Sequence, residues 1–409
     1  MHSENKRDEG LRLLRRGLEL EHANRVEEAV AHYRDAARVC PTLREAHNAL
    51  GVYYQRSGLM AKAAEAFRNV VALDGDFLAY YNLGYVLVEL ERFEDALESF
   101  GSCLSMAPDD SATHMEIGFI HLSRGEYGQA ISHLQHPLHS YPEDWEVHNM
   151  LGKSYLGLRR FDEALAAFGR AVTHTNSPRA QIELLDNIAT VMRHREFHSL
   201  NTVKDQVYAQ DGVVYLGSAQ DDGLNVRTVE DYHFTYPDIG TTLQRLIALV
   251  QSSGWHYTAI LAADTLAQPL AAALSEPLKL PIRSIGELTD QDHVLLVFAV
   301  AREAELLLLT LERLPAPATA VCLGLNWQRH SRILPDIIGI AAQGSCSVPW
   351  ESELRRLRSD GAPSAAISAC LQQATEAIGY AIRETPLDHN LSRQMRYYTR
   401  SHRRLNVHG

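Results

Sequence analysis

The feature that most constrains the fold is a repeat in the first 178 residues. Five glycines stand 34, 33, 34 and 34 residues apart, at Gly17, Gly51, Gly84, Gly118 and Gly152. An alanine follows each glycine by 12 residues and a bulky residue follows each alanine by four: Ala29 and Tyr33, Ala63 and Phe67, Ala96 and Phe100, Ala130 and Leu134, Ala164 and Phe168. A fixed period of this length is typical of stacked units that cannot bury their apolar faces alone.

Each unit is predicted to be a pair of antiparallel helices. The glycine and alanine allow the two helices to approach closely, and the bulky residue fills the space toward the next unit. Residues that break helices stand near the unit ends: Pro41, Gly75, Pro108, Pro142, and Asn176 followed by Pro178. We therefore divide residues 10–178 into five units: 10–43, 44–76, 77–110, 111–144 and 145–178.

This pattern of a small residue, an alanine, an aromatic residue and a proline resembles the tetratricopeptide repeat family over residues Gly10 to Pro178. The resemblance implies an all-α solenoid whose first helices line a concave groove that receives a peptide or a partner helix. The sequence departs from the family at Gly75 and Asn176, where the closing proline is missing. Pro137 stands inside the second helix of the fourth unit and predicts a kink there.

The family register places nine residues of the first helices in that groove: Asn48, Val52, Gln55, Tyr81, Tyr85, Met115, Phe119, Asn149 and Lys153. Their centre is apolar and their ends are polar, which favours an apolar anchor site flanked by groups that hold an extended backbone. The alternative is that Tyr81, Tyr85 and Phe119 pack against one another or against the rest of the chain. A clamp for a chaperone C-terminal tail is not expected, because Leu14 and Leu18 occupy the positions of its lysine and asparagine.

The segments around the repeats differ in character. Residues 1–9 are predicted to be a polar tail. An amphipathic helix over 179–200 is predicted to cap the stack, because Ile182, Leu185, Ile188 and Met192 recur at helical spacing. At the other end, 391–409 is predicted to be a basic helix or tail with arginines at helical spacing: Arg393, Arg396, Arg400 and Arg403.

Residues 201–390 are predicted to form an α/β domain. Short β-branched runs read as strands at Val213–Leu216, Tyr257–Ala262, His293–Phe298 and Ala318–Leu323. Helical stretches stand between or beside them at Ile239–Gln251, Leu266–Leu274 and Arg302–Leu314. This alternation favours a mostly parallel sheet with helices on both faces, and so a three-layer domain.

Two stretches of this domain resemble type I phosphoribosyltransferases: YTAILAADTLAQPLAAALSEPLKLPI from Tyr257, and HVLLVFAVA from His293. The resemblance covers about 130 residues and implies a related fold. In active members the second stretch ends in two acidic residues and a loop of small residues that cradles a phosphate. Here Phe298 and Ala299 replace the acids, and Ala301, Arg302 and Glu303 replace the loop. Catalysis of that kind is therefore not predicted.

Other candidate sites each have a structural explanation. His133, His136 and His139 recur at spacings of three, with His114 and His121 nearby, but Pro137 interrupts them and no cysteine or placed carboxylate completes a metal site. Asp264 follows a predicted strand, where open sheets bind ligands, yet it also suits a helix cap. Asp221 and Asp222 precede Gly223, which favours a turn over a cation site. No catalytic residue, metal or cofactor is predicted.

Composition and charge narrow the kinds of partner and the compartment that we expect. The net charge of −12 disfavours general binding to nucleic acid or anionic membranes. The apolar stretches are too short or too interrupted to span a bilayer. Five scattered cysteines without a C-x-x-C pair favour a reduced cytosolic protein, and the polar N-terminus MHSENKRDEG does not read as a secretory signal.

Two functions remain in view. The first is an adaptor or scaffold that binds a partner peptide or helix in the repeat groove and carries a non-catalytic α/β domain. The alternative is an enzyme that acts on a nucleotide or sugar phosphate through that domain. The second requires a phosphate site that the family's motif does not supply here.

Overall fold

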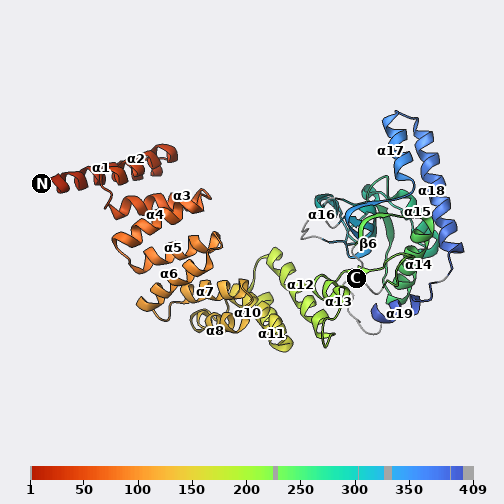
Figure 1. Ribbon diagram of the computed structural model, residues 1–409, viewed down its shortest axis with the longest axis horizontal. Helices are drawn as coiled ribbons and strands as arrows, with labels where there is room; N and C mark the ends of the chain where they lie inside the picture. The colour runs from red at the N-terminus through yellow and green to blue at the C-terminus, as the bar shows by residue number, and fades with distance from the viewer. Residues whose placement is uncertain (1, 224–228, 303, 327–333, 387, 399–409) are drawn as a thin grey trace. The chain divides into compact units, whose positions relative to one another are not determined.

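The computed structural model describes the chain except for residues 1, 224–228, 303, 327–333, 387 and 399–409. It divides into two compact units, Met1–Ile188 and Ala189–Gly409 (Figure 1). The first is a helical repeat unit and the second is an α/β unit. The division falls within one helix, α12 (Pro178–Arg195), which begins one residue before the segment 179–200 predicted as a cap.

The repeat unit consists of successive helix pairs, as predicted. The pairs are α1 (His2–His22) with α2 (Val26–Val39), α3 (Arg44–Arg56) with α4 (Met60–Leu73), α5 (Phe77–Glu89) with α6 (Phe93–Met106), α7 (Ser111–Ser123) with α8 (Tyr127–Leu134), and α10 (Trp145–Gly157) with α11 (Phe161–His174). The second helix of each of the first four pairs packs against the first helix of the next. This stacking buries an apolar face that a single pair would leave in water.

The repeated glycine and the repeated bulky residue pack directly against each other. A Cβ atom placed on Gly84 would lie 2.7 Å from the ring of Phe100, and one on Gly51 would lie 2.6 Å from the ring of Phe67. The same close approach recurs in the other three units. Both rings are fully buried. The period therefore records a steric requirement, because a side chain at the glycine would displace the ring.

Two details differ from the sequence-based assignment. The first helix begins at His2, so residues 2–9 are helical and do not form a separate tail. In the fourth unit the predicted kink is a break: α8 ends at Leu134, and a short helix α9 (Pro137–Ser140) follows. Proline lacks the N–H that would continue the helix and its ring clashes with the preceding turn, which explains the break at Pro137.

The α/β unit contains a parallel sheet in the order β1-β6-β5-β4-β3, with β2 paired to β6. Its strands are β1 (Val214–Tyr215), β2 (Val229–His233), β3 (Ala259–Ala262), β4 (Val294–Ala301), β5 (Ala318–Asn326) and β6 (Ile337–Ser347). All pairings among these described strands are parallel, in agreement with the prediction. Strands β2 and β6 were not predicted.

Helices cover both faces of the sheet. One face packs against α14 (Tyr236–Ser253), α15 (Gln268–Leu278) and α18 (Ser364–Glu384), and the other against α16 (Ala304–Arg313). Strand β4 divides its side chains between the two cores: Leu295 and Val297 enter the first, and Leu296 and Phe298 the second. A strand buried on both faces reads as a continuous apolar run, which is why VLLVFAVA shows no alternation of polar residues.

The described part of the segment predicted as a separate basic tail, residues 391–398, belongs to the α/β core. Helix α19 (Leu391–Arg396) packs against α14, and Gln394 and Tyr398 are fully buried. The Tyr398 hydroxyl accepts a hydrogen bond from Tyr215 N at 2.9 Å and lies 3.0 Å from Tyr215 O. Arg400 and Arg403 lie outside the described residues.

Candidate functional site

The nine predicted groove residues all lie on the first helices of their units, α3, α5, α7 and α10. Neighbouring first helices contact one another, α5 with α7 and α7 with α10. We call the side of these helices that carries the nine residues the first-helix surface. Phe119 is the most exposed of its apolar members, with 41% of its surface accessible, and the others are partly buried. That this surface receives a partner stays a prediction.

The central aromatic residues are divided between packing and exposure. Tyr81 stacks on Phe77, with ring centroids 6.1 Å apart, and meets Phe100 edge to face at 5.7 Å. Met115 packs against the core of the fourth and fifth units. Packing within the repeats thus accounts for Tyr81 and Met115, whereas Phe119 keeps 41% of its surface accessible.

A carboxylate that sequence reasoning missed lies among these aromatic residues. Glu116 on α7 is partly buried, and no hydrogen bond or ion pair of its side chain is found among the described residues. Burial, followed by the charge of Glu89, raises the pKa of Glu116 to about 7. Burial raises the pKa values of Tyr81 and Tyr85, and the charge of Glu116 adds to both shifts. The signal in the sequence was only that Glu116 stands between two predicted groove residues.

The polar residues in the fifth unit already have partners. Asn149 accepts a hydrogen bond from the Asn187 side chain at 3.2 Å, and Lys153 Nζ lies 3.2 Å from Glu183. Both partners lie on α12, in the segment predicted to cap the stack. Asn149 and Lys153 therefore hold α12 against the fifth unit, which leaves the surface of α5 and α7 as the better candidate for binding.

The histidines of the fourth unit cluster between α7 and the two helices that follow it, α8 and α9. The His114 ring is buried, lies parallel to the His136 ring with centroids 3.9 Å apart, and places Nδ1 2.9 Å from His133 Nδ1. Burial, with the neighbouring histidines, lowers the pKa of His133 to about 4. Across the described residues, no group of three or more His, Cys, Asp or Glu side chains is arranged to hold a metal ion.

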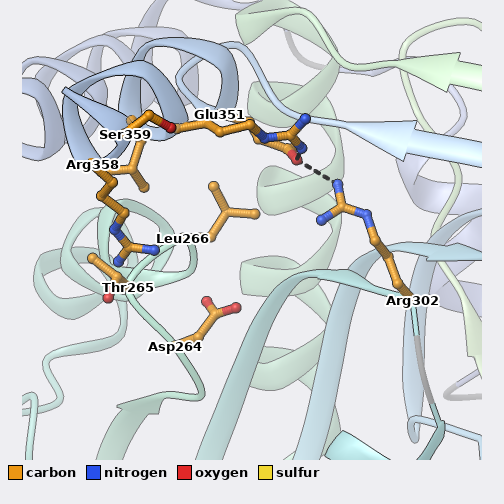
Figure 2. Close-up of a pocket in the computed structure, with 9 residues that line it drawn as sticks. Asp264, Thr265, Leu266, Arg302, Glu351, Arg358 and Ser359 are labelled. Atoms are coloured by element: carbon orange, nitrogen blue, oxygen red, sulfur yellow. Dashed lines mark hydrogen bonds and ion pairs between the residues drawn. The ribbon is translucent and has the colours of Figure 1, made fainter.

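The α/β unit has a second candidate site, a pocket of about 330 Å³ at the carboxyl ends of β3 and β4 (Figure 2). The pocket is lined by Asp264, Thr265, Leu266, Arg302, Glu351, Leu354, Arg355, Arg358 and Ser359. Asp264 and its two neighbours follow β3, Arg302 follows β4, and the rest belong to α17 (Glu351–Ser359) and its C-terminal end. Asp264 accepts a hydrogen bond from Ala267 N at 2.8 Å in the turn before α15. Helix α15 begins at Gln268 and its N-cap residue is Ala267, so Asp264 stabilises this turn and is not the predicted helix cap.

The residues that replace the transferase motif are built into the structure. Phe298 and Ala299 are buried within β4, so neither offers a polar group at the strand end. Arg302 instead donates to Glu351 Oε1 at 2.6 Å. Glu303 lies outside the described residues.

The acidic pair before Gly223 includes a structural residue. Asp221 accepts from Gly223 N at 2.8 Å and from the Tyr215 hydroxyl at 3.1 Å, and it lies 3.4 Å from the buried Arg245. The predicted turn therefore accounts for Asp221. These contacts leave no reason to assign it a cation.

Comparison with known families identifies the repeats. A tetratricopeptide repeat model matches residues 14–76, 48–110, 81–144 and 120–180. Together these matches extend over 14–180 and thus over the predicted units. The helical unit is a tetratricopeptide-repeat region, and such repeats imply interaction with other proteins.

Curated relatives share the repeats over short stretches. A TPR repeat-containing protein of Methanocaldococcus jannaschii is 27% identical over 126 residues, which are 31% of this chain and 22% of the relative. Superkiller protein 3 of Schizosaccharomyces pombe is 26% identical over 156 residues, 36% of this chain and 11% of the relative. This chain thus spans less than a quarter of the length of either relative.

Solved structures give similar matches to part of the chain. YrrB, described as a TPR protein with an unusual peptide-binding site, is 20% identical and aligns with a TM-score of 0.41 over 45% of this chain and 94% of its own. PilF of Pseudomonas aeruginosa is 19% identical, with a TM-score of 0.36 over 51% of this chain and 98% of its own. Among the described residues, no helix is long and apolar enough to cross a membrane.

Proposed function

We propose that this tetratricopeptide-repeat protein is a scaffold that binds a partner peptide or helix on the first-helix surface, with the strongest contacts on α5 and α7. The observation that carries the proposal is the exposed Phe119, one turn of α7 after Glu116, whose carboxylate has no hydrogen bond or ion pair in the described part of the chain. A large exposed aromatic residue gains free energy when a partner covers it, and such residues dominate binding at protein interfaces.

The charge of this surface adds a preference for the partner. A partly buried carboxylate close to a second one, Glu89, is costly to keep ionised, as the raised pKa of Glu116 reflects. A cationic side chain of a partner would relieve that cost, and the ring of Tyr85 would provide a cation–π contact beside it. We therefore propose a partner segment with an apolar residue over Phe119 and a lysine or arginine near Glu116.

The test is to identify the partner and then weaken its binding by substitutions on this surface. Affinity-tagged protein is recovered from cells that make it natively, and recovered proteins are compared for wild type, Tyr85→Ala and Phe119→Ala. We expect both variants to lose a partner that wild type retains. Tyr141→Ala, which removes a tyrosine that is 63% exposed outside the first helices, is the matched control and should retain it.

A direct measurement then examines the charge preference. Calorimetric titration of the identified segment against Glu116→Gln should show affinity lowered by about tenfold, together with a weaker dependence on salt. Undiminished binding to Phe119→Ala would place the interface elsewhere. Equal binding to Glu116→Gln would remove only the preference for a cation.

For the α/β unit we propose a non-catalytic role as part of the adaptor, in a reducing cytosolic environment. The buried Phe298 and Ala299 support this, because the strand end lacks the acidic residues on which the transferase chemistry depends. The five cysteines are all free thiols, which fits a reducing compartment. The resemblance of this unit to phosphoribosyltransferases is likewise a proposal about its fold. Failure of the full chain to turn over phosphoribosyl donors is the expected result of a direct assay.

A further inference from the structure

The pocket at the carboxyl ends of β3 and β4 combines a cavity with an excess of positive charge. Three arginines line it against two carboxylates, those of Asp264 and Glu351. In open parallel sheets this edge is where ligands are bound, because the loops that follow adjacent strands converge there. The volume of about 330 Å³ suits a small organic molecule and exceeds what a single inorganic ion would fill.

The arginines are not equivalent. Arg302 and Arg355 both donate to the same oxygen of Glu351, at 2.6 and 2.8 Å, so Glu351 holds these two guanidinium groups at the pocket wall. Arg358 has no ion pair or side-chain hydrogen bond among the described residues. Figure 2 shows its side chain extending from α17 toward Thr265. Its guanidinium group is therefore available to an anion in the pocket.

The carboxylates offer acceptors on the same cavity. Glu351 is 8% exposed, and its second oxygen, Oε2, is buried with no hydrogen-bond partner among the described residues. One oxygen of Asp264 accepts from Ala267 N, and no second bond of its side chain is found in the described part of the chain. A buried acceptor such as Glu351 Oε2 is normally satisfied, so it points to a donor supplied by a ligand or by water. Asp264 is exposed, and its second oxygen is open to solvent or to a ligand. Leu266 and Leu354 provide an apolar wall beside them.

We propose that this pocket binds a small phosphate ester, with the phosphate on Arg358 and a hydroxyl or ammonium donor of the ester near Asp264 and Glu351. A guanidinium group presents its donors in a fork that matches phosphate oxygens, and the charge-assisted bonds are stronger than neutral ones. The site differs from a backbone phosphate cradle because side chains of α17 supply the positive charge. It is independent of partner binding by the repeats.

Calorimetric titration of the full chain tests this, with glycerol phosphate, inorganic phosphate, glycerol and succinate as probes. We expect saturable binding of glycerol phosphate at millimolar concentration or below, weaker binding of inorganic phosphate, and none of glycerol or succinate. Arg358→Gln should lower the affinity for glycerol phosphate by about tenfold or more, since one charged hydrogen-bonding group is lost. Because Arg358 is exposed and unpaired among the described residues, the variant should retain the wild-type melting temperature.

Arg356→Gln is the matched control. It removes the same charge from the same helix, but Arg356 pairs with Glu353 at 2.8 Å and does not line the pocket. The affinity of Arg356→Gln for glycerol phosphate should stay within about twofold of wild type, because loss of an exposed ion pair has little effect. Equal weakening by both variants would show that only general surface charge is involved, and would overturn the site.

Asp264→Asn separates the two halves of the proposed ligand. The amide oxygen can still accept from Ala267 N, so the turn before α15 is kept. Inorganic phosphate should bind as well or better, because a negative charge is gone, whereas the advantage of glycerol phosphate over phosphate should shrink. Binding of succinate as tight as that of glycerol phosphate would contradict the phosphate assignment. No saturable binding of either phosphate to wild type would contradict the proposal as a whole.

Discussion

The two units of this protein are stabilised over very different distances along the chain. In the repeat unit, Gly84 packs against Phe100 of the same helix pair, and the contact recurs from pair to pair. In the α/β unit, Arg245 on α14 is 1% exposed and joins Asp388 at 2.7 Å and Leu216 O at 2.7 Å, groups that are far from it in sequence. The first design repeats one local contact, and the second depends on a few buried polar residues.

This difference has a consequence for how each unit fails. A repeat array gains its stability from each unit and from each interface with a neighbour, so damage stays near the altered pair. Removing one member of a buried ion pair leaves the other charge uncompensated in the core, and this lowers the stability of the whole domain. Substitutions in the two units should therefore differ in both size and reach.

The largest effect is expected from Arg245→Met. Asp221 and Asp388 would remain buried without their cation, and the carbonyls of Leu216 and Ser218 would lose a donor. We expect the free energy of unfolding of the α/β unit to fall by roughly 3–5 kcal/mol. Urea denaturation followed by hydrogen exchange of β1 and α14 measures it.

A partly exposed pair of the same unit provides the control for Arg245. Arg283 lies 2.8 Å from Asp292 and its side chain is 37% exposed. Arg283→Met should cost less than about 1 kcal/mol. Comparable losses for the two variants would contradict the view that the buried links dominate this unit.

The second effect is a pH dependence confined to the α/β unit. Lys204 is 1% exposed, lies 4.4 Å from the ring centroids of Tyr397 and Tyr398, and donates to Gly223 O. Burial lowers the pKa of Lys204 from 10.5 to about 7. Between these values the unfolded chain binds more protons than the folded one, so stability should rise from pH 7 toward pH 10, by on the order of 2–4 kcal/mol.

Lys204→Met should flatten that slope, because the amine whose pKa differs between the folded and unfolded chain is gone. Lys279→Met, an exposed change in the same unit, should leave it unchanged. Chemical denaturation at a series of pH values, read from exchange of α13 (Val203–Asp211), distinguishes the two. A slope that persists in Lys204→Met would assign the pH dependence to another group.

The third effect tests the glycine contact with two substitutions in one helix pair. Gly84→Ala places a Cβ atom 2.7 Å from the buried Phe100 ring and should destabilise the third unit by about 1–3 kcal/mol. Gly101→Ala meets nothing within 4 Å at an exposed position of α6 and should stabilise the unit by roughly 0.5–1 kcal/mol, through helix propensity alone. Thermal unfolding shows whether each substitution raises or lowers the melting temperature. A stabilising Gly84→Ala would show that the period of the glycines has no steric cause.

The smallest effect is a pH dependence of the stability of the repeats, and it occurs at acid pH. The folded-state pKa of His133 lies near 4 and the ordinary value is 6.5, so protonation favours the unfolded chain. Exchange protection of α7 and α8 should be complete above pH 6.5 and should fall as the pH drops toward 4. His133→Asn should reduce this dependence and His139→Gln, on the exposed α9, should not; the reverse order would exclude His133 as its source.

Sequence reasoning succeeded where one residue type is forced by one local contact. The repeats were predictable because Gly84 and Phe100 restrict each other at a fixed spacing, and the parallel sheet because β4 is apolar throughout. Strand β6 was missed although it is central in the sheet, since its segment contains glycines and serines and follows a stretch without clear periodicity.

The sites were predictable only in part. Asp264 could be placed at the end of a strand, but Arg358 could not, because its helix follows the strand that was missed. The buried roles of Arg245 and Lys204 leave no pattern in the sequence, since charged residues at these positions would ordinarily be read as surface residues. Glu116 looks like any polar residue of an amphipathic helix until its neighbours are known.

The short helix α8 sets a mechanical limit on the repeat array. It has eight residues, against 14 in each of α4, α6 and α11, because the chain breaks before Pro137. When tension is applied to the two ends of the array, the fourth pair should therefore detach at the lowest load. Since Phe119 lies on α7, which pairs with α8, a segment bound as we propose would be released before the remaining pairs come apart.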